Sequence, residues 1–308
     1  EVCLPLLAEV SPYPCSFDHA ATVQLEDLPL LPRDAWRKVR TLGEANFGKV
    51  YLVEGCLPGL PRVFALKQMR RQAVLASGKS LESASNELCA ALALAPLRLP
   101  FIAKVLFVGR DEGSFYLATE YCEHGELLTV LQRRKEGGFK QEHVIRDILW
   151  QVLQALSSLH ASGAAHRDIS LENVLVTGDG SIRLCDFGQA VLTHAPGGEA
   201  EEKPVAPSCR GPPGKPFYRS PEADAARPYL ASKLDVFACG VLLHALAVGT
   251  YPSFCDPSKN FLRHKEPVTD RCTEVLSELM ELGLEEQVSP GLLDLMVQML
   301  APDPAKRI

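Results

Sequence analysis

The sequence predicts an α+β fold in which a smaller, strand-rich N-terminal part precedes a larger and mainly helical part. From Trp36 to Thr119 the pattern is strand-like, with one helical stripe among the strands. From Ile145 onward, apolar residues recur at helical spacing. The chain has 308 residues, of which 46% are hydrophobic, and this is enough for one large two-lobed domain or two smaller ones.

Charge and cysteine content exclude several classes of protein. The net charge is −6 and the chain has no long basic run, so we expect neither nucleic acid nor an anionic membrane surface as partner. The longest nearly apolar run, 236–248, is too short to span a bilayer and predicts a buried helix. The ten cysteines include no C-x-x-C pair, which disfavours zinc and favours reduced thiols in an intracellular protein, cytoplasmic with the nucleus left open.

Residues 1–33 are rich in proline and lack sustained periodicity, so we predict an N-terminal extension before a domain that covers 34–308. The chain begins with Glu rather than Met. We therefore expect it to be part of a longer product.

The strand signals of the N-terminal part surround two features that could contact phosphate. The segment Gly43–Val50 is either a loop that covers a phosphate or an ordinary β-turn, since glycine allows close backbone approach. Lys67 ends an apolar run and could equally be a solvated lysine at a strand end. The strand-like runs are 36–42, 50–53, 63–67 and 115–119.

Helical spacing is clearest in the second half of the chain. A shorter stripe through Leu88 and Ala95 follows Glu87 in the first part. The long stripe ends at Gly163, and a further helix begins at Asp235. The long stripe consists of Ile145, Ile148, Leu149, Val152, Leu153, Leu156 and Leu159.

A polar stretch, His166-Arg167-Asp168-Ile169-Ser170-Leu171-Glu172-Asn173, lies between apolar sequence on both sides. So many polar side chains in such a place indicate chemistry. The carboxylate of Asp168 could accept a hydroxyl proton while the amide oxygen of Asn173 ligates a hard cation. A second carboxylate, in Asp186-Phe187-Gly188, comes 18 residues after Asp168, with two short strands and a Gly-Asp-Gly turn between them.

These two loops, in this order after Lys67, closely resemble the catalytic loop and the metal-binding triplet of eukaryotic protein kinases, and the serine/threonine type fits better than the tyrosine type. The resemblance implies a bilobal kinase fold, with a small β-rich N-lobe that carries one main helix and a larger, mainly helical C-lobe. The N-lobe would cover about 34–119, the hinge about 120–125 and the C-lobe about 126–308. The final helix would be truncated at Ile308.

The resemblance also assigns roles to individual residues. Asp168 would act as catalytic base, Asn173 and Asp186 would hold Mg²⁺, and Lys67, paired with Glu87, would contact the phosphates of ATP. Glu82 is the competing partner for Lys67, although Glu87 leads directly into the apolar stripe. The nucleotide site would consist of Leu42, Gly43, Ala45, Gly48, Val50, Ala65, Lys67, Glu87, Thr119, Glu120, Cys122, Glu126, Leu175 and Asp186, with Thr119 as the gatekeeper.

Three positions depart from the family pattern. Ala45 stands at a glycine position, Ser170 stands where serine/threonine kinases carry a lysine, and Lys215 stands where they carry a threonine. We hypothesise that Lys215 brings its charge to Asp168 and the γ-phosphate from the opposite loop while Ser170 supplies the hydroxyl. The alternative is that Lys215 is merely exposed and the enzyme is weakened.

Other predicted contacts concern regulation and substrate. Arg167 would receive a phosphate on Thr193 or Ser208, or else the carboxylate of Glu199, Glu201 or Glu202; alternatively, the segment is a solvated insert. Glu222 would pair with Arg307, and Asp235 would accept hydrogen bonds from the catalytic loop.

The predicted partners are protein substrates. Glu126 and Glu172, if both face a bound peptide, would favour arginine upstream of its phosphorylated residue, although Glu126 could equally be a helix-start carboxylate. The competing functions are a pseudokinase scaffold and a small-molecule phosphotransferase.

Overall fold

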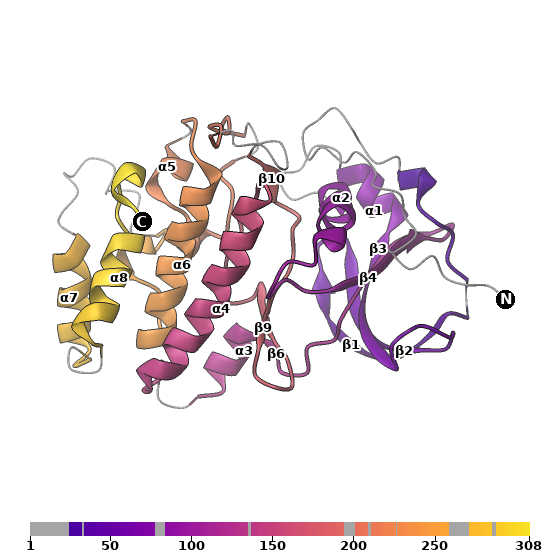
Figure 1. Ribbon diagram of the computed structural model, residues 1–308, viewed down its shortest axis with the longest axis horizontal. Coiled ribbons are helices and arrows are strands. Elements are labelled where there is room, and N and C mark those ends of the chain that lie inside the picture. The colour runs from indigo at the N-terminus through magenta and orange to yellow at the C-terminus, as the bar shows by residue number, and fades with distance from the viewer. Residues whose placement is uncertain are drawn as a thin grey trace.

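The computed structural model describes residues 25–32, 34–77, 84–134, 137–193, 201–208, 211–225, 227–258, 271–284 and 288–308. Most of the predicted N-terminal extension, together with Glu82 and Glu199, lies outside these residues. The described chain forms a strand-rich N-lobe and a helical C-lobe that lie side by side along the long axis (Figure 1). The predicted bilobal α+β fold is therefore confirmed.

The N-lobe is built on a five-stranded antiparallel sheet with strand order β1-β2-β3-β5-β4. One face is closed by aromatic packing, in which the ring of Phe107 lies 5.8 Å from that of Trp36 and 5.7 Å from that of Phe64. The strands are β1 (Trp36–Ala45), β2 (Gly48–Gly55), β3 (Val63–Arg70), β4 (Val105–Arg110) and β5 (Ser114–Thr119).

Two helices, α1 (Arg71–Ser77) and α2 (Ala84–Leu94), lie together beside the sheet (Figure 1). The α2 helix is the predicted helical stripe, and seven of its eleven residues are buried because it packs on the sheet and borders the C-lobe core. Its first turn carries Glu87, which is thereby directed into the protein.

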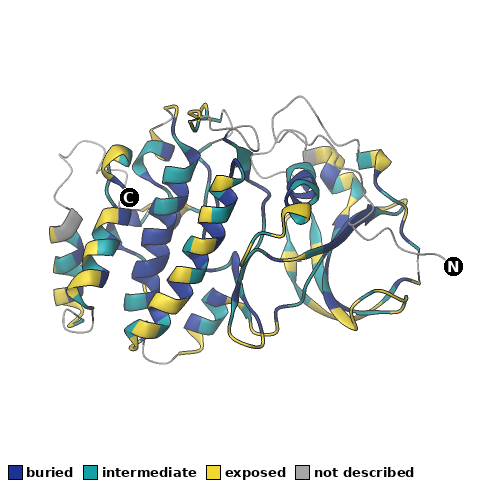
Figure 2. Cartoon of the chain, viewed as in Figure 1, coloured by how far each residue is buried: buried dark blue, intermediate teal, exposed yellow. Residues whose placement is uncertain are grey.

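The C-lobe is organised around α6 (Ala231–Val248), which is dark blue over most of its length in Figure 2 because its neighbours cover it. The helix is longer than the apolar run 236–248, and by length and composition it could cross a membrane. It is, however, 78% buried inside the lobe, as expected for a core helix. The other helices are α3 (Leu127–Gln132), α4 (Glu142–Ala161), α5 (Pro221–Asp224), α7 (Arg271–Glu281) and α8 (Pro290–Met299).

Short strands at the junction of the lobes carry the functional loops. The antiparallel strands β6 (Gly125–Glu126), β8 (Val174–Val176) and β9 (Ile182–Leu184) form one small sheet. The strands β7 (Ala164–Ala165) and β10 (Val191–Leu192) form another. The predicted hairpin between the two polar loops is thus present, and it fixes where each loop begins and ends.

The segment that joins α2 to β4 fastens the N-lobe to the C-lobe. The N–H of Ala103 donates to the carbonyl of Leu184 at 2.9 Å, and the N–H of Leu184 donates to the carbonyl of Phe101 at 2.7 Å. The Phe101 ring meets the edge of Trp150 on α4 with ring centroids 5.7 Å apart. These contacts hold the sheet over the catalytic loops.

Candidate active site

The face of the N-lobe sheet that looks into the cleft follows from the strand register. Val50 pairs with Lys67, and Ala65 pairs with Thr119. Because directly paired residues point to the same face and alternate residues share it, these four side chains lie together. Leu42 stands at the β1 register shift between Thr41 and Gly43. This face combines small apolar side chains with one ammonium group.

Lys67 forms the expected pair with Glu87. Its Nζ atom lies 2.6 and 2.7 Å from the two carboxylate oxygens, and the two side chains are only 13% and 7% exposed. The same Nζ atom is 3.7 Å from Oδ2 of Asp186. The α2 helix, the sheet and the Asp186 loop therefore meet at one ammonium group.

The catalytic loop is fixed to α6 through Asp235, as predicted. Oδ2 of Asp235 accepts the N–H of His166 at 2.9 Å, and Oδ1 accepts the N–H of Arg167 at 2.7 Å. His160 of α4 also contacts Oδ2 at 2.8 Å. Arg167 adopts a positive φ of 63°, and these bonds stabilise that conformation.

Both nitrogens of the His166 ring are used structurally. Nδ1 accepts the N–H of Asp168 at 3.2 Å, and Nε2 lies 3.0 Å from the carbonyl of Cys185. With both ring nitrogens engaged inside the protein, His166 has none left for substrate. This geometry gives His166 a supporting role in the loop.

Asp168 and Asn173 form the centre of the site. The side-chain amide of Asn173 donates to the carbonyl oxygen of Asp168 at 2.7 Å and to its Oδ2 at 2.9 Å. Oδ1 of Asp168 is buried and has no hydrogen-bond partner among the described residues. A buried carboxylate oxygen without a donor can accept one from a substrate.

Electrostatics separate the two aspartates. Burial raises the pKa of Asp168 above its ordinary value, although the charge of Lys215 opposes the rise. Burial would also raise the pKa of Asp186, but the ammonium of Lys67 and the N–H of Gly188 bring it below its ordinary value. Asp186 is thus held as an anion, which suits a cation ligand, whereas the raised pKa of Asp168 favours a role as proton acceptor.

Lys215 reaches the catalytic loop from the segment before α5. Its Nζ atom lies 2.7 Å from Oγ of Ser170 and 3.7 Å from Oδ2 of Asp168. Ser170 is fully buried, so its hydroxyl has little choice of partner. An ammonium group and a hydroxyl thus lie together beside Asp168.

The two glycines of the hairpin between β1 and β2 have different structural roles. A Cβ atom on Gly43 would meet nothing within 4 Å, so this position is open to the cleft. A Cβ atom on Gly48 would lie 1.9 Å from the carbonyl oxygen of Gln68. Gly48 is therefore required by the close approach of β2 and β3, and Ala45 at the end of β1 keeps the turn at Asn46 and Phe47 short.

The hinge leaves backbone groups available. The N–H of Glu120 donates to the carbonyl of Lys104, and the carbonyl of Cys122 accepts the N–H of Gly125. In the described part of the chain, the carbonyl of Glu120 and the N–H of Cys122 have no hydrogen-bond partner. Such groups can pair with the edge of a base.

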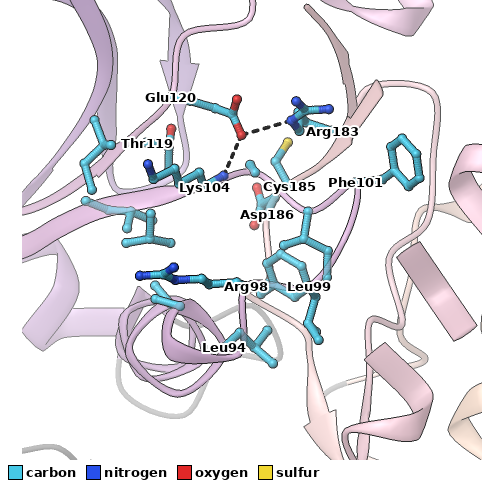
Figure 3. Close-up of a pocket in the computed structure, with 18 of the residues that line it drawn as sticks. Leu94, Arg98, Leu99, Phe101, Lys104, Thr119, Glu120, Arg183, Cys185 and Asp186 are labelled. Carbon is cyan, nitrogen blue, oxygen red and sulfur yellow. Dashed lines mark hydrogen bonds and ion pairs between the residues drawn. The ribbon is translucent and has the colours of Figure 1, made fainter. Parts of the chain in front are cut away.

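The side chain of Glu120, in contrast, points behind the hinge. It accepts hydrogen bonds from Nε of Arg183 at 3.0 Å and from the N–H of Lys104 at 2.8 Å, as Figure 3 shows. These groups border a cavity of about 1260 Å³ that Thr119 and Asp186 also line. Any part of Glu120 in a nucleotide site is thus its backbone.

Burial also affects the two thiols near the hinge. Burial and the charge of Glu120 raise the pKa of Cys122 to about 12. Burial likewise raises the pKa of Cys185, whose Sγ atom lies 3.4 Å from the carbonyl of Asn173. A raised pKa keeps a thiol protonated, which suits a packing role for both residues.

Two carboxylates lie where β6 meets the catalytic loop. Glu126 precedes α3 but makes no side-chain cap, so it does not serve as a helix-start hydrogen-bond acceptor. Burial and the charge of Glu172 raise its pKa. Oε2 of Glu172 is buried without a partner among the described residues. Leu175 is paired with Glu126 across the small sheet.

Arg167 has different partners from those expected. Its guanidinium donates to the carbonyl of Gln189 at 2.7 Å and to the hydroxyl of Tyr229 at 3.0 Å. Glu202 instead accepts the N–H of Ser232 at 3.0 Å and also its hydroxyl, at the start of α6. The alternative in which Glu202 pairs with Arg167 is therefore wrong. The N-terminus of α6 offers this carboxylate both donors and a favourable dipole.

The rear of the C-lobe contains the predicted ion pair. Arg307 is bidentate with Glu222 at 2.6 and 3.1 Å and has no exposed side-chain surface. It also donates to the carbonyls of Lys233 and Ala301. This pair fixes the segment that carries Lys215 to the end of the described chain.

Sequence reasoning missed two polar residues that hold the loops. Asn86 donates to the carbonyls of Phe187, Gly188 and Ala190 at 3.4, 3.0 and 3.0 Å. Gln189 accepts the N–H of Gly214 at 2.9 Å. In the sequence, Asn86 could have been noticed only because it precedes Glu87. Gln189 could have been noticed only because it follows the Asp-Phe-Gly triplet.

The fold and this cleft define a protein kinase domain. The family model described as protein kinase domain matches residues 36–308. The chain is 30% identical over 300 residues to CBL-interacting protein kinase 21 of Oryza sativa subsp. japonica, an alignment that covers 94% of this chain and 51% of the relative. It is 28% identical over 271 residues to the hormonally up-regulated neu tumor-associated kinase of Homo sapiens, an alignment that covers 87% of this chain and 34% of the relative.

The chain therefore belongs to the protein kinase family. It spans about half the length of the rice relative.

Proposed function

We propose that this chain is an active protein kinase that transfers the γ-phosphate of ATP to serine and threonine hydroxyls of proteins, with Mg²⁺ as its metal. The observation that carries the proposal is Asp168, whose Oδ1 atom is buried without a donor while Asn173 fixes its Oδ2 atom. The site thus combines a proton acceptor with the Lys67–Glu87 pair. A scaffold needs neither.

The residues fit a nucleotide and a hard cation. The hinge offers the carbonyl of Glu120 and the N–H of Cys122 to adenine, and Lys67 is held toward the phosphates by Glu87. Asn173 turns its amide nitrogen toward Asp168. Its amide oxygen is thus left as a ligand that could hold a cation together with the carboxylate of Asp186. Magnesium bound there would offset the negative charge of the phosphates.

The chain's own residues then act on the hydroxyl and its target. Asp168 accepts the proton of the incoming hydroxyl at Oδ1, and its raised pKa matches that task. Lys67 stabilises the phosphate oxygens, and Lys215 adds a second positive charge near Asp168. Ser170 orients Lys215 by accepting its hydrogen bond.

The kind of hydroxyl that accepts the phosphate is inferred from Ser170 and from the loop before Glu222. Tyrosine kinases usually carry alanine or arginine at the Ser170 position and a tryptophan before their triplet, whereas this chain has Phe217 and Tyr218. Serine and threonine are therefore the proposed acceptors, and substrates with arginine upstream of them are proposed from Glu126 and Glu172. An intracellular, cytoplasmic site of action is proposed from the cysteine pattern.

The second candidate is a pseudokinase scaffold, which Ala45, Ser170 and Lys215 favour because they depart from the family pattern. One experiment separates the two. The purified chain is incubated with Mg²⁺ and γ-labelled ATP, and label is measured on a generic protein. Transfer that is lost in Asp186→Ala and recovered as phosphoserine or phosphothreonine supports the kinase. Nucleotide binding without any transfer supports the scaffold.

A further inference from the structure

Lys215 is presented by a backbone that is held on both sides. The N–H of Gly214 donates to Oε1 of Gln189 at 2.9 Å, and the carbonyl of Gly214 accepts from Nε of Arg219 at 2.9 Å. Gly214 has a φ of +83°, and a Cβ atom there would lie 3.2 Å from the carbonyl oxygen of Arg167. The peptide that precedes Lys215 is therefore seated against the catalytic loop by side chains.

Gln189 is itself fixed from two other elements. Its carbonyl accepts Nε of Arg167 at 2.7 Å, and the carbonyls on either side of it accept the amide of Asn86 from α2. Its side chain is buried, with 8% of the residue exposed. The bond to Gly214 thus joins the loop that carries Asp186 to the loop that carries Lys215.

We propose that Gln189 is a positioning residue that sets Lys215 in place through the Gly214 N–H. A lysine stem has many rotamers, so a hydrogen bond of 2.7 Å from Nζ to Ser170 requires a well-placed backbone. Among the hydrogen bonds of the described residues, those of Gln189 go to Gly214 and Arg167 and not to Ser170 or Asp168. Its effect on phosphate transfer therefore passes through Lys215, and this inference rests on the proposed kinase activity.

The test begins with Gln189→Met, which keeps an unbranched side chain but removes the acceptor. We expect kcat to fall about 3- to 10-fold, the equivalent of one neutral hydrogen bond, with the KM for ATP unchanged because the hinge and Lys67 are untouched. Gln189→Glu retains an oxygen that can accept the Gly214 N–H, and we expect it to restore most of kcat.

A second measurement does not depend on activity. Hydrogen exchange of the peptide that contains Gly214 and Lys215 is expected to accelerate in Gln189→Met and to stay slow in Gln189→Glu. Gln151→Met is the matched control, because Oε1 of Gln151 also accepts a backbone N–H at 2.9 Å, that of Ile182, away from Lys215. It should leave exchange at Gly214 unchanged.

The decisive comparison places Gln189→Met in a Lys215→Thr background. If Gln189 acts through Lys215, the second substitution lowers kcat by less than about twofold. An equal fall in both backgrounds, or unchanged exchange at Gly214, overturns the inference. A wild-type chain that transfers no phosphate would instead refute the proposed function, and the exchange result would still decide whether Gln189 holds this loop.

Discussion

The ammonium of Lys215 donates a 2.7 Å hydrogen bond to the hydroxyl of Ser170, across a separation of 45 residues in sequence. The same ammonium lies 3.7 Å from the carboxylate of Asp168. An ammonium and a hydroxyl thus lie together beside the carboxylate of Asp168, although each comes from the loop where the family usually has the other. This geometry supports the hypothesis that the two residues have exchanged roles.

The exchange predicts non-additive mutations. Lys215→Thr should lower kcat by about 10- to 100-fold, because it removes a charge directed at the transferred phosphate. Ser170→Lys alone should also be impaired, since it places two ammonium groups around Asp168. The double variant should recover part of the activity, and steady-state kinetics of all four proteins measure this. Effects that simply add would remove the idea.

The pH profile provides an independent prediction. If Asp168 is the base, as proposed, transfer requires its ionised form. Burial places its pKa above the ordinary value, so kcat should fall as the pH drops through that raised value. Lys215 lowers this pKa, and Lys215→Thr should therefore move the acid limb of kcat to higher pH. Lys38→Thr makes the same charge change on β1 and should leave the limb in place. A limb that stays, or moves to lower pH, in Lys215→Thr contradicts the assignment.

The arrangement of the candidate active site was predictable from sequence because its residues are positioned by short, regular elements. A hairpin of two short strands separates Asn173 from Asp186, so their relative places follow from the spacing. Lys67 and Glu87 are likewise fixed by a strand and a helix that pack together. Spacings of this kind can be read directly from the sequence.

The polar contacts that position the centre were not predictable. Gln189 and Gly214 are 25 residues apart, and Glu202 and Ser232 are 30 apart. A single glutamine or glutamate looks the same in sequence whether it is solvated or buried against a backbone N–H. The side chain of Glu120 turned away from the predicted nucleotide site for a similar reason, since Arg183 becomes its neighbour only when β9 reaches the hinge.

The Glu222–Arg307 pair predicts a large loss of stability when the carboxylate of Glu222 is removed. Glu222→Ala would leave the fully buried guanidinium of Arg307 without its carboxylate, at a cost of about 3 kcal/mol or more. Urea unfolding measures this change. Glu54→Ala removes the partner of Arg37 from a pair in which the arginine side chain is 74% exposed, and it should cause no measurable loss. Equal effects of the two substitutions would show that the buried pair contributes nothing special.

Glu126 and Glu172 predict the substrate preference. Burial raises the pKa of Glu126, and the nearby carboxylate of Glu172 raises it further. Oε2 of Glu172 has no partner in the described residues. A cation on a bound peptide would offset the repulsion between these two carboxylates, and one guanidinium can pair with both. A degenerate peptide library should therefore select arginine upstream of the phosphorylated residue.

Variants sharpen this prediction. Glu126→Gln with Glu172→Gln should lower the selection for arginine, because each substitution removes a charge while keeping the size of the side chain. Glu123→Gln is the control: its carboxylate is already engaged by the N–H of Gly178 at 2.6 Å, on the neighbouring turn, so it should leave the preference as it is. A wild-type library profile without any basic preference, or one that the double variant leaves unchanged, would mean that these carboxylates do not meet the peptide.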